Sequence, residues 1–312
     1  MRRPARKKVL FIRDFRGFTG GHQKVFDYYS HLVGSPEFEP ILYLTPDSLR
    51  DQTNPWIAGG HQVLDSIPAP DIFFVAGLDW DILDKHGVEP GRRPVINLVQ
   101  GLRHTDPRDP RFRFLEREAF RICVSQEVRE ALKATCRTKG SLLTIPNGIE
   151  LPQHLSIPPA NLRTGVFIGG WKQPALAREL AQKLRQDSIP VDVCMDQVPR
   201  NDFLTRTAAC QVAVMLPWTM EGFFLPALEA MALDTALVVP DCVGNRSFCL
   251  HAINCLMPEY QIMDLVAATK DLLNNTVLRS KLVKAGRTCA TEHSLGQECC
   301  RWLEVLRSLE SN

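Results

Sequence analysis

The chain has 312 residues, of which 45% are hydrophobic and 23% are charged, and its 37 basic side chains nearly balance 35 acidic ones. This composition is typical of an ordinary globular protein, so it excludes a strongly basic nucleic-acid-binding chain, and we expect no nucleic-acid partner. The length is sufficient for two domains, each with a core of its own.

The N-terminus is basic but does not have the pattern of a secretion signal. Its basic side chains are Arg2, Arg3, Arg6, Lys7 and Lys8. The apolar stretch that follows, residues 9–12, is too short for the core of a signal peptide, and no later apolar run is long enough to span a bilayer. We therefore expect a cytoplasmic protein with a solvated basic end. A peripheral contact of this end with the inner membrane surface is the alternative.

Short apolar runs rich in β-branched residues alternate with longer helical patterns in the first half of the chain. This alternation is typical of parallel sheets that helices cover on both faces. Strands are expected at residues 8–12, 39–44, 71–76, 95–99, 121–124 and 142–145. Helices are expected at residues 23–32, 112–119 and 127–135.

The same alternation repeats in the second half of the chain. Strands are expected at residues 164–168, 191–195, 211–216 and 236–239. Helices are expected at residues 174–185, 200–208 and 226–232, with a helical tail from residue 261 onward. Between the halves, residues 145–159 contain an Asn-Gly pair and several prolines, which interrupt both helices and central strands.

These patterns predict an α/β fold with two Rossmann-like, doubly wound domains that face a cleft, where ligands of such folds bind beyond the strand ends. We place the first domain at residues 1–148, a linker at 149–162, the second domain at 163–293 and a terminal helix at 294–312. The apolar residues of this last helix favour packing on the first domain over a membrane anchor, and a dimer contact there is an alternative. They are Trp302, Leu303, Val305, Leu306 and Leu309.

No metal site is expected. The ten cysteines form no C-x-x-C pair, and most lie in apolar runs, which favours buried free thiols in a reducing compartment. The string Asp79-Trp80-Asp81 has a D-x-D spacing, but we interpret Asp81 as a helix cap.

The most informative segment follows the strand expected at 211–216 and contains Glu221 and Glu229. Pro226 suits the first turn of a helix, so the preceding loop leads into the positive end of a helix dipole, whose free amides bind phosphate oxygens. Glu221 then lies in the loop and Glu229 about one turn into the helix. Both carboxylates can accept hydrogen bonds from the vicinal hydroxyls of a ribose or a hexose.

This segment resembles the E-x7-E element of the retaining group 1 glycosyltransferases, which have the GT-B fold. In outline, the family pattern is E-G-F-G-x-x-x-x-E-A-M-A. The matching positions are Glu221, Gly222, Phe223, Glu229, Ala230, Met231 and Ala232. Phe224 replaces the usual second glycine, which makes the loop bulkier. The resemblance implies that Glu221 contacts the transferred sugar, that Glu229 holds the nucleotide ribose, and that Gly222, Phe223, Phe224 and Leu225 contact the donor.

Further matches extend over most of the chain. Residues 145–150 resemble the family's interdomain I-P-N-G-I-D/E segment. Gly170 and Lys172 lie where the family has a Gly-Arg pair and a nearby lysine that neutralise the donor's diphosphate. The arginine is absent here, so the resemblance makes Lys172 the catalytic cation, alone or aided by Arg246 or Arg103.

In the first half, Gly20 and Gly21 resemble the family's glycine-rich loop that approaches the donor phosphate and the acceptor, although any tight strand-to-helix turn favours glycine. Gln100 takes the position of a family histidine near the reacting centre, and His104 follows closely. For His104 two interpretations remain, an exposed surface residue and a functional residue of the site. Arg246 lies where the family has a Gly-Gly-x-x-Glu pattern, and with Gln100 and His104 it is a candidate acceptor or phosphate contact.

The resemblance implies a metal-independent, retaining hexosyltransferase that moves a sugar from a nucleotide-diphosphate donor to a hydroxyl of a glycan, a lipid-linked or a small-molecule acceptor, as in polysaccharide biosynthesis. It implies no cofactor besides the donor substrate. Two alternatives stay open, a nucleotide-sugar 2-epimerase and a non-catalytic GT-B subunit.

Overall fold

The computed structural model describes residues 5–309, and the chain divides into two units. The first combines the residues up to Asn147 with those from Glu298 onward, and the second is Gly148–Gln297. The segment expected as a linker, residues 149–162, therefore lies within the second unit.

Part of the basic N-terminal run belongs to folded structure. Lys7 and Lys8 lie in the first strand, and Arg6 forms an ion pair with Glu39 at 3.7 Å. Arg2 and Arg3 lie outside the described residues. Within residues 5–309, every helix is too short or too polar to cross a lipid bilayer.

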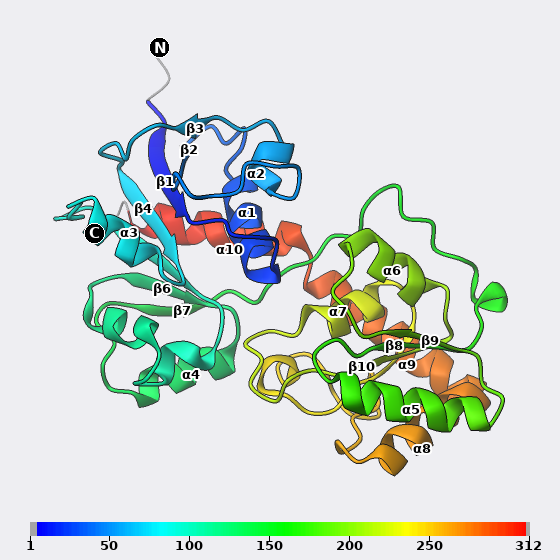
Figure 1. The fold of residues 1–312 in the computed structure, drawn as a ribbon. Helices are drawn as coiled ribbons and strands as arrows, with labels where there is room; N and C mark the ends of the chain where they lie inside the picture. The colour runs from blue at the N-terminus through cyan, green and yellow to red at the C-terminus, as the bar shows by residue number, and fades with distance from the viewer. Residues whose placement is uncertain (1–4, 310–312) are drawn as a thin grey trace. The chain divides into compact units, whose positions relative to one another are not determined.

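The first unit is built on a seven-stranded parallel sheet with the order β3-β2-β1-β4-β5-β6-β7 (Figure 1). The strands are β1 (Lys7–Arg13), β2 (Phe38–Leu44), β3 (Val63–Leu64), β4 (Ile72–Ala76), β5 (Val95–Val99), β6 (Phe120–Cys123) and β7 (Leu142–Thr144). The α-helices are α1 (Gly20–Ser30), α2 (Pro55–Ala58), α3 (Asp79–Lys85) and α4 (Gln126–Ala134). Two 3₁₀ helices are η1 (Leu102–Thr105) and η2 (Pro110–Glu116).

Four short elements of this unit, α2, β3, α3 and η1, are missing from the elements expected from sequence. In α3 the carboxylate of Asp79 accepts the Ala76 N–H at 2.8 Å. The assignment of Asp81 as a helix cap is wrong, because this residue lies within the first turn of α3 and its carboxylate pairs with Arg113.

The helix expected at residues 112–119 is instead the 3₁₀ helix η2. A buried arginine on β6 explains this difference. Arg121 donates to the carbonyls of Phe114 and Leu115, at 2.8 and 2.9 Å, and to that of Arg117, at 2.6 Å. These carbonyls are satisfied by the guanidinium, so the segment needs no continuing α-helix to pair them.

The second unit is built on a four-stranded parallel sheet with the order β11-β10-β8-β9. The strands are β8 (Val166–Gly169), β9 (Val191–Cys194), β10 (Val212–Met215) and β11 (Ala236–Val238). The helices are α5 (Pro174–Gln186), α6 (Arg200–Ala208), α7 (Leu225–Ala232), α8 (Ile262–Asn274), α9 (Thr276–Glu292) and the 3₁₀ helices η3 (Ala160–Leu162) and η4 (Val243–Asn245). Helices α5 and α8 pack together on one face of the sheet, and α6 and α7 pack together on the other (Figure 1). Helix α9 contacts both α7 and α8 and packs beside the edge strand β11.

Each sheet has one point where the chain order reverses. In the first sheet β1 lies between β2 and β4, and in the second β8 lies between β9 and β10. The loops that leave the carboxyl ends of the two strands at such a reversal splay apart, and ligands of open α/β sheets bind there. The positions to examine are therefore the ends of β1 and β4, and the ends of β8 and β10.

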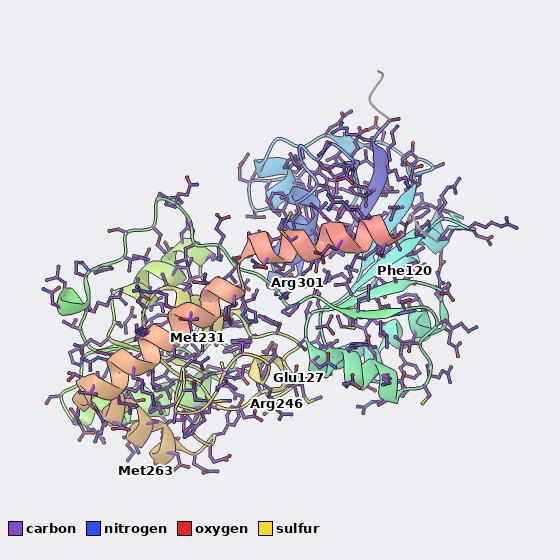
Figure 2. The ribbon with its side chains drawn as sticks, turned by 180° about the vertical axis from the view of Figure 1, so that it is seen from behind. Phe120, Glu127, Met231, Arg246, Met263 and Arg301 are labelled. Carbon is purple, nitrogen blue, oxygen red and sulfur yellow. The ribbon has the colours of Figure 1, made fainter. Side chains whose placement is uncertain are left out.

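The terminal helix α10 (Leu295–Ser308) packs in the first unit from Glu298 onward (Figure 2). Trp302 is fully buried and makes edge contacts with Tyr28 and Phe74, at 5.3 and 5.6 Å between ring centroids. The Glu298 carboxylate is also buried and pairs with Lys24 of α1 at 2.7 Å. An apolar stripe and one buried ion pair thus hold the end of the chain on the first unit.

Candidate functional site

Two loops meet where the order of the second sheet reverses. One leaves β8 and carries Trp171 and Lys172, and the other leaves β10 and carries Pro217 to Glu221. The Pro217 carbonyl ties these loops to their surroundings, because it accepts hydrogen bonds from the Gln173 side chain at 3.2 Å and from the Tyr260 hydroxyl at 3.3 Å. The two loops are therefore held in place on the protein.

Lys172 and Glu221 form an ion pair at this position. Lys172 Nζ lies 2.5 Å from Glu221 Oε1, and each side chain is only 14% exposed. The backbone N–H of Trp218 donates to the same carboxylate oxygen at 3.3 Å. Three rings surround the ammonium, with centroids 5.5 Å (Trp171), 5.4 Å (Trp218) and 5.1 Å (Phe224) from Nζ. Aromatic faces attract a cation, so these rings help to hold the Lys172 ammonium at the site.

A second ion pair lies one turn into α7. The Glu229 carboxylate is buried, and its Oε1 accepts from Arg200 Nε at 2.7 Å. Arg200 also donates through Nη2 to the Glu150 carbonyl at 3.0 Å, which fixes the guanidinium. Burial raises the pKa of Glu229 above its ordinary value, and the nearby Arg200 opposes that rise. Sequence reasoning missed Arg200, because it lies 29 positions from its partner and begins another helix.

The segment between the two glutamates is closely packed. The Phe224 N–H donates to the Gly244 carbonyl at 2.9 Å, and the Leu225 N–H donates to Phe223 at 3.2 Å. A side chain at Gly244 would lie within 2.7 Å of the Phe223 nitrogen, so only glycine allows this approach. Gly222 is buried in the same turn. The amides of Phe224 and Leu225 are therefore engaged inside the protein, whereas the sequence favoured free amides at this helix end.

Gly170 has a packing role in this structure. A Cβ atom at this position would lie 2.1 Å from Ala177 Cβ, so the glycine allows α5 to approach the end of β8. The Gly170 N–H donates to the Cys194 carbonyl at 2.9 Å. Arg246, the candidate phosphate contact, forms an ion pair with Asp241 at 2.5 Å on an exposed part of the unit.

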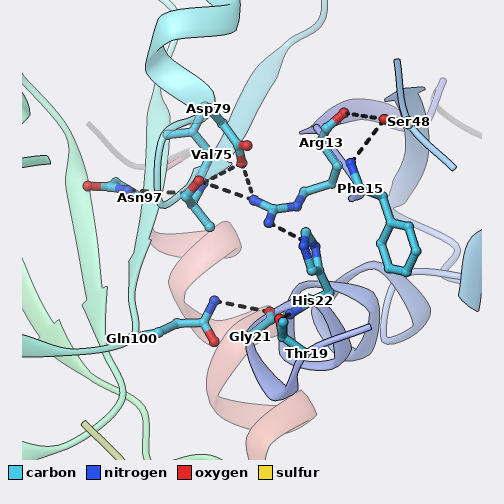
Figure 3. A network of polar contacts seen from close by, with 11 residues as sticks. Arg13, Phe15, Thr19, Gly21, His22, Ser48, Val75, Asp79, Asn97 and Gln100 are labelled. Carbon is cyan, nitrogen blue, oxygen red and sulfur yellow. Dashed lines mark hydrogen bonds and ion pairs between the residues drawn. The ribbon is translucent and has the colours of Figure 1, made fainter. Parts of the chain in front are cut away.

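The first sheet has a polar network at its own reversal point (Figure 3). Arg13, at the end of β1, donates to Asp79 at 2.5 Å, to the Ala76 carbonyl at 3.1 Å and to His22 Nδ1 at 3.0 Å. A guanidinium only donates, so Nδ1 of His22 must accept and the ring is neutral with its proton on Nε2. Burial and Arg13 lower the pKa of His22 to about 4.

Burial raises the pKa of Asp79, the network's carboxylate, to about 6 against the opposing effect of Arg13. Gly20 and Gly21 open α1 beside this network, and Gln100 donates from its side chain to the Gly21 carbonyl at 3.1 Å. The structure thus brings Gly21 and Gln100 together.

His104 does not lie on the surface, so that alternative is wrong. Its side chain is 5% exposed in η1, and burial together with Arg111 lowers its pKa to about 3. Among residues 5–309, no group of three or more His, Cys, Asp or Glu side chains is arranged to hold a metal ion. The ten cysteines are free thiols, most of them buried.

Residues 161–288 match the family model of the group 1 glycosyl transferases. This stretch includes both ion pairs, Lys172 with Glu221 and Arg200 with Glu229. No curated protein matches the chain in sequence.

Solved structures share the fold of the whole chain at low sequence identity. HepE of Anabaena, crystallised with UDP-glucose, aligns with a TM-score of 0.74 and 14% identity, over 97% of this chain and 100% of its own. Sucrose-phosphate synthase of Thermosynechococcus elongatus aligns with a TM-score of 0.71 and 14% identity, over 98% of this chain and 100% of its own.

A third similar structure is a Listeria monocytogenes protein proposed to be a UDP-N-acetylglucosamine 2-epimerase. It aligns with a TM-score of 0.67 and 14% identity, over 99% of this chain and 98% of its own. The family match and these structures confirm the resemblance on which the expected GT-B fold was based.

Proposed function

We propose that the chain transfers a sugar from a nucleotide-diphosphate donor to an acceptor hydroxyl, with retention of configuration. The match of residues 161–288 to the group 1 glycosyl transferase model and the GT-B fold support this proposal. The observation that carries this proposal is the arrangement of two carboxylates, Glu221 and Glu229, around the start of α7, each paired with its own cation. Both lie next to the reversal point of the second sheet, where ligands of this kind of fold bind.

In this proposal the Lys172–Glu221 pair is exchanged for contacts to the donor, while the Arg200–Glu229 pair is kept. Glu221 receives hydroxyls of the transferred sugar, and Lys172 turns to the diphosphate. Glu229 has a second carboxylate oxygen besides the one that accepts from Arg200, and this oxygen receives the ribose hydroxyls. Arg200 opposes the effect of burial on the pKa of Glu229 and so favours its ionised form, the better hydrogen-bond acceptor for two hydroxyls.

The proposed reaction breaks the bond between the anomeric carbon and the β-phosphate oxygen. The acceptor oxygen forms the new bond on the same face, and its proton passes to the departing diphosphate. Negative charge accumulates on that diphosphate, so Lys172 stabilises the transition state more than the ground state. A side-chain cation in this position performs the work for which other transferases use a divalent metal, and we propose a metal-independent reaction.

Calorimetry of the purified chain against UDP, GDP, ADP and TDP in the presence of EDTA tests the donor site. We expect one nucleotide to bind and Glu229→Gln to weaken it, while Glu179→Gln, an exposed position on α5, leaves binding unchanged. UDP is the first to examine, because HepE was crystallised with UDP-glucose. If none of the four binds at millimolar concentration, the non-catalytic subunit becomes the better account.

The 2-epimerase is a second candidate because a protein proposed to have that activity shares the fold over nearly the whole chain. Product analysis separates the two. A transferase releases the nucleoside diphosphate and needs an acceptor for a glycosylated product. An epimerase converts UDP-N-acetylglucosamine without any acceptor, and that result would replace the proposed function.

A further inference from the structure

Two of the five tryptophans are exposed, and they lie side by side at the reversal point of the second sheet. Trp171 lies two residues after β8 and is 40% exposed, and Trp218 follows β10 and is 45% exposed. The three other tryptophans, Trp56, Trp80 and Trp302, are at most 2% exposed. Large aromatic side chains that are left open next to a ligand site call for a binding partner rather than a packing role.

The indole of Trp218 is held by a hydrogen bond, and the indole of Trp171 packs against it. The indole N–H of Trp218 donates to the Lys172 carbonyl at 2.8 Å, so this ring turns its polar edge to the protein. The ring centroids of Trp171 and Trp218 lie 5.7 Å apart with 62° between the planes. Lys172 Nζ lies near both rings, and Pro217 is anchored by two hydrogen bonds. A preorganised surface of this kind loses little side-chain entropy when it binds a ligand.

The chemistry of this surface suits the apolar face of a sugar ring. An aromatic face is electron-rich and attracts polarised C–H groups, which a pyranose presents on one face, while its hydroxyls point outward to water or to carboxylates. A nucleobase fits less well here, because we place the ribose at Glu229. The two tryptophans lie instead next to Glu221, whose carboxylate accepts from the backbone N–H of Trp218.

We propose that Trp171 and Trp218, whose planes are 62° apart, form a platform on which a pyranose ring of a glycan acceptor stacks against one indole and contacts the other. This rests on the proposed transferase function, and it extends it by naming a saccharide as the acceptor class. The transferred sugar must reach the carboxylate of Glu221, which is only 14% exposed, whereas the indole faces lie further out in solvent. We therefore assign the sugar ring that covers the two indoles to the acceptor, not to the donor.

The distribution of tryptophans offers a direct test. Acrylamide, a neutral quencher, reaches the fluorescence of exposed indoles, so in this chain it reports on Trp171 and Trp218 alone. Methyl pyranosides of glucose, galactose, mannose and N-acetylglucosamine, with maltose and cellobiose, are added with and without UDP. We expect at least one saccharide to protect the fluorescence, and Trp218→Ala to weaken its binding roughly tenfold, as for the loss of one stacked ring.

Met220→Ala serves as the matched control, since Met220 is 65% exposed in the same loop but has no ring, and we expect it to leave saccharide binding unchanged. Normal UDP binding without protection by any saccharide overturns the platform and leaves the proposed function standing. If only UDP-glucose protects the fluorescence, the tryptophans bind the donor sugar, and if UDP itself protects it, they bind the base. If only phosphatidylglycerol vesicles protect it, the tryptophans contact a membrane. If no nucleotide binds at all, the proposed function is wrong instead.

Discussion

Lys172 and Glu221 neutralise one another across the reversal point of the second sheet, with Nζ 2.5 Å from Oε1 and a ring of three aromatic side chains around the ammonium. The pair ties the loop after β8 to the loop after β10. Each charge therefore has a partner before any substrate binds. A donor that separates the pair must supply stronger contacts for both Lys172 and Glu221. A diphosphate beside a set of sugar hydroxyls provides that exchange.

This competition makes Glu221→Gln an informative variant. The amide keeps the shape of the side chain but no longer holds Lys172 by charge, so Lys172 is freed for the diphosphate. We expect UDP to bind more tightly to the variant, while transfer falls by about a hundredfold because the sugar loses its charged acceptor. Calorimetry and a transfer assay check both effects. If UDP binding weakens in parallel with transfer, Glu221 and Lys172 do not exchange partners.

Arg200→Met removes the cation that opposes burial at Glu229. The pKa of Glu229, already raised, should rise further, so the carboxylate becomes protonated at a higher pH than in the parent chain. We expect nucleotide affinity to fall as the pH is lowered, and to begin falling at a higher pH in the variant. Calorimetry across a pH series shows this. In a Glu229→Gln background Arg200→Met should have little additional effect, and a full additional loss would mean that Arg200 contacts the nucleotide directly.

The strand and the helix start of the candidate site segment could be predicted from local sequence. Pro226 and the apolar run of β10 place a helix start after a buried strand, and Glu221 and Glu229 are fixed by their spacing around it. Arg200 could not be found in this way, because its role depends on α6 and α7 packing together. The cation–aromatic cluster around Lys172 likewise joins two loops that are far apart in the chain.

The same distinction holds for the fold. Strands such as β4 and β10 are continuous apolar runs and were expected within a residue or two of their bounds. The short helix α3 has a polar sequence with weak periodicity, and its start is stabilised by the contact of Asp79 with the Ala76 N–H. The 3₁₀ form of η2 depends on Arg121, which belongs to the following strand.

Acid should destabilise the chain through His104. The pKa of this residue is about 3 in the folded protein, against the ordinary value of 6.5 in the unfolded chain. Between these values the unfolded chain binds a proton that the folded chain does not, so stability falls as the pH drops below 6.5. The loss at pH 5 is about 2 kcal/mol relative to pH 7. Urea unfolding at both pH values should show a smaller difference for His104→Gln, and an unchanged difference relative to the parent chain would contradict the assignment.

Glu298→Gln tests how α10 is held on the first unit. Glu298 is buried and pairs with Lys24 at 2.7 Å and with His31 at 3.0 Å, while Lys24 also pairs with Asp27 at 2.8 Å. Breaking a buried ion pair is strongly destabilising, but Lys24 keeps Asp27 as an ionic partner. We therefore expect the free energy of unfolding to fall by roughly 3 kcal/mol, at the low end for a buried pair. Arg307, on the same helix, forms an exposed pair with Glu37, so Arg307→Gln is the control and should have a much smaller effect on stability.

Gly170→Ala separates a packing role for this glycine from a ligand role. The added methyl would lie 2.1 Å from Ala177 Cβ, so α5 must move away from β8, and we expect a loss of about 1 to 3 kcal/mol in stability. Ala177→Gly alone should cost about 1 kcal/mol through its effect on the helix. When Gly170→Ala and Ala177→Gly are combined, the Cβ removed from residue 177 makes room for the one added at residue 170, so the two losses of stability should not add.

Urea unfolding of the parent chain, the two single variants and the double variant measures this coupling. Restored stability together with unchanged UDP binding would assign Gly170 to packing, whereas restored stability with lost binding would show that the donor itself needs the space above the glycine.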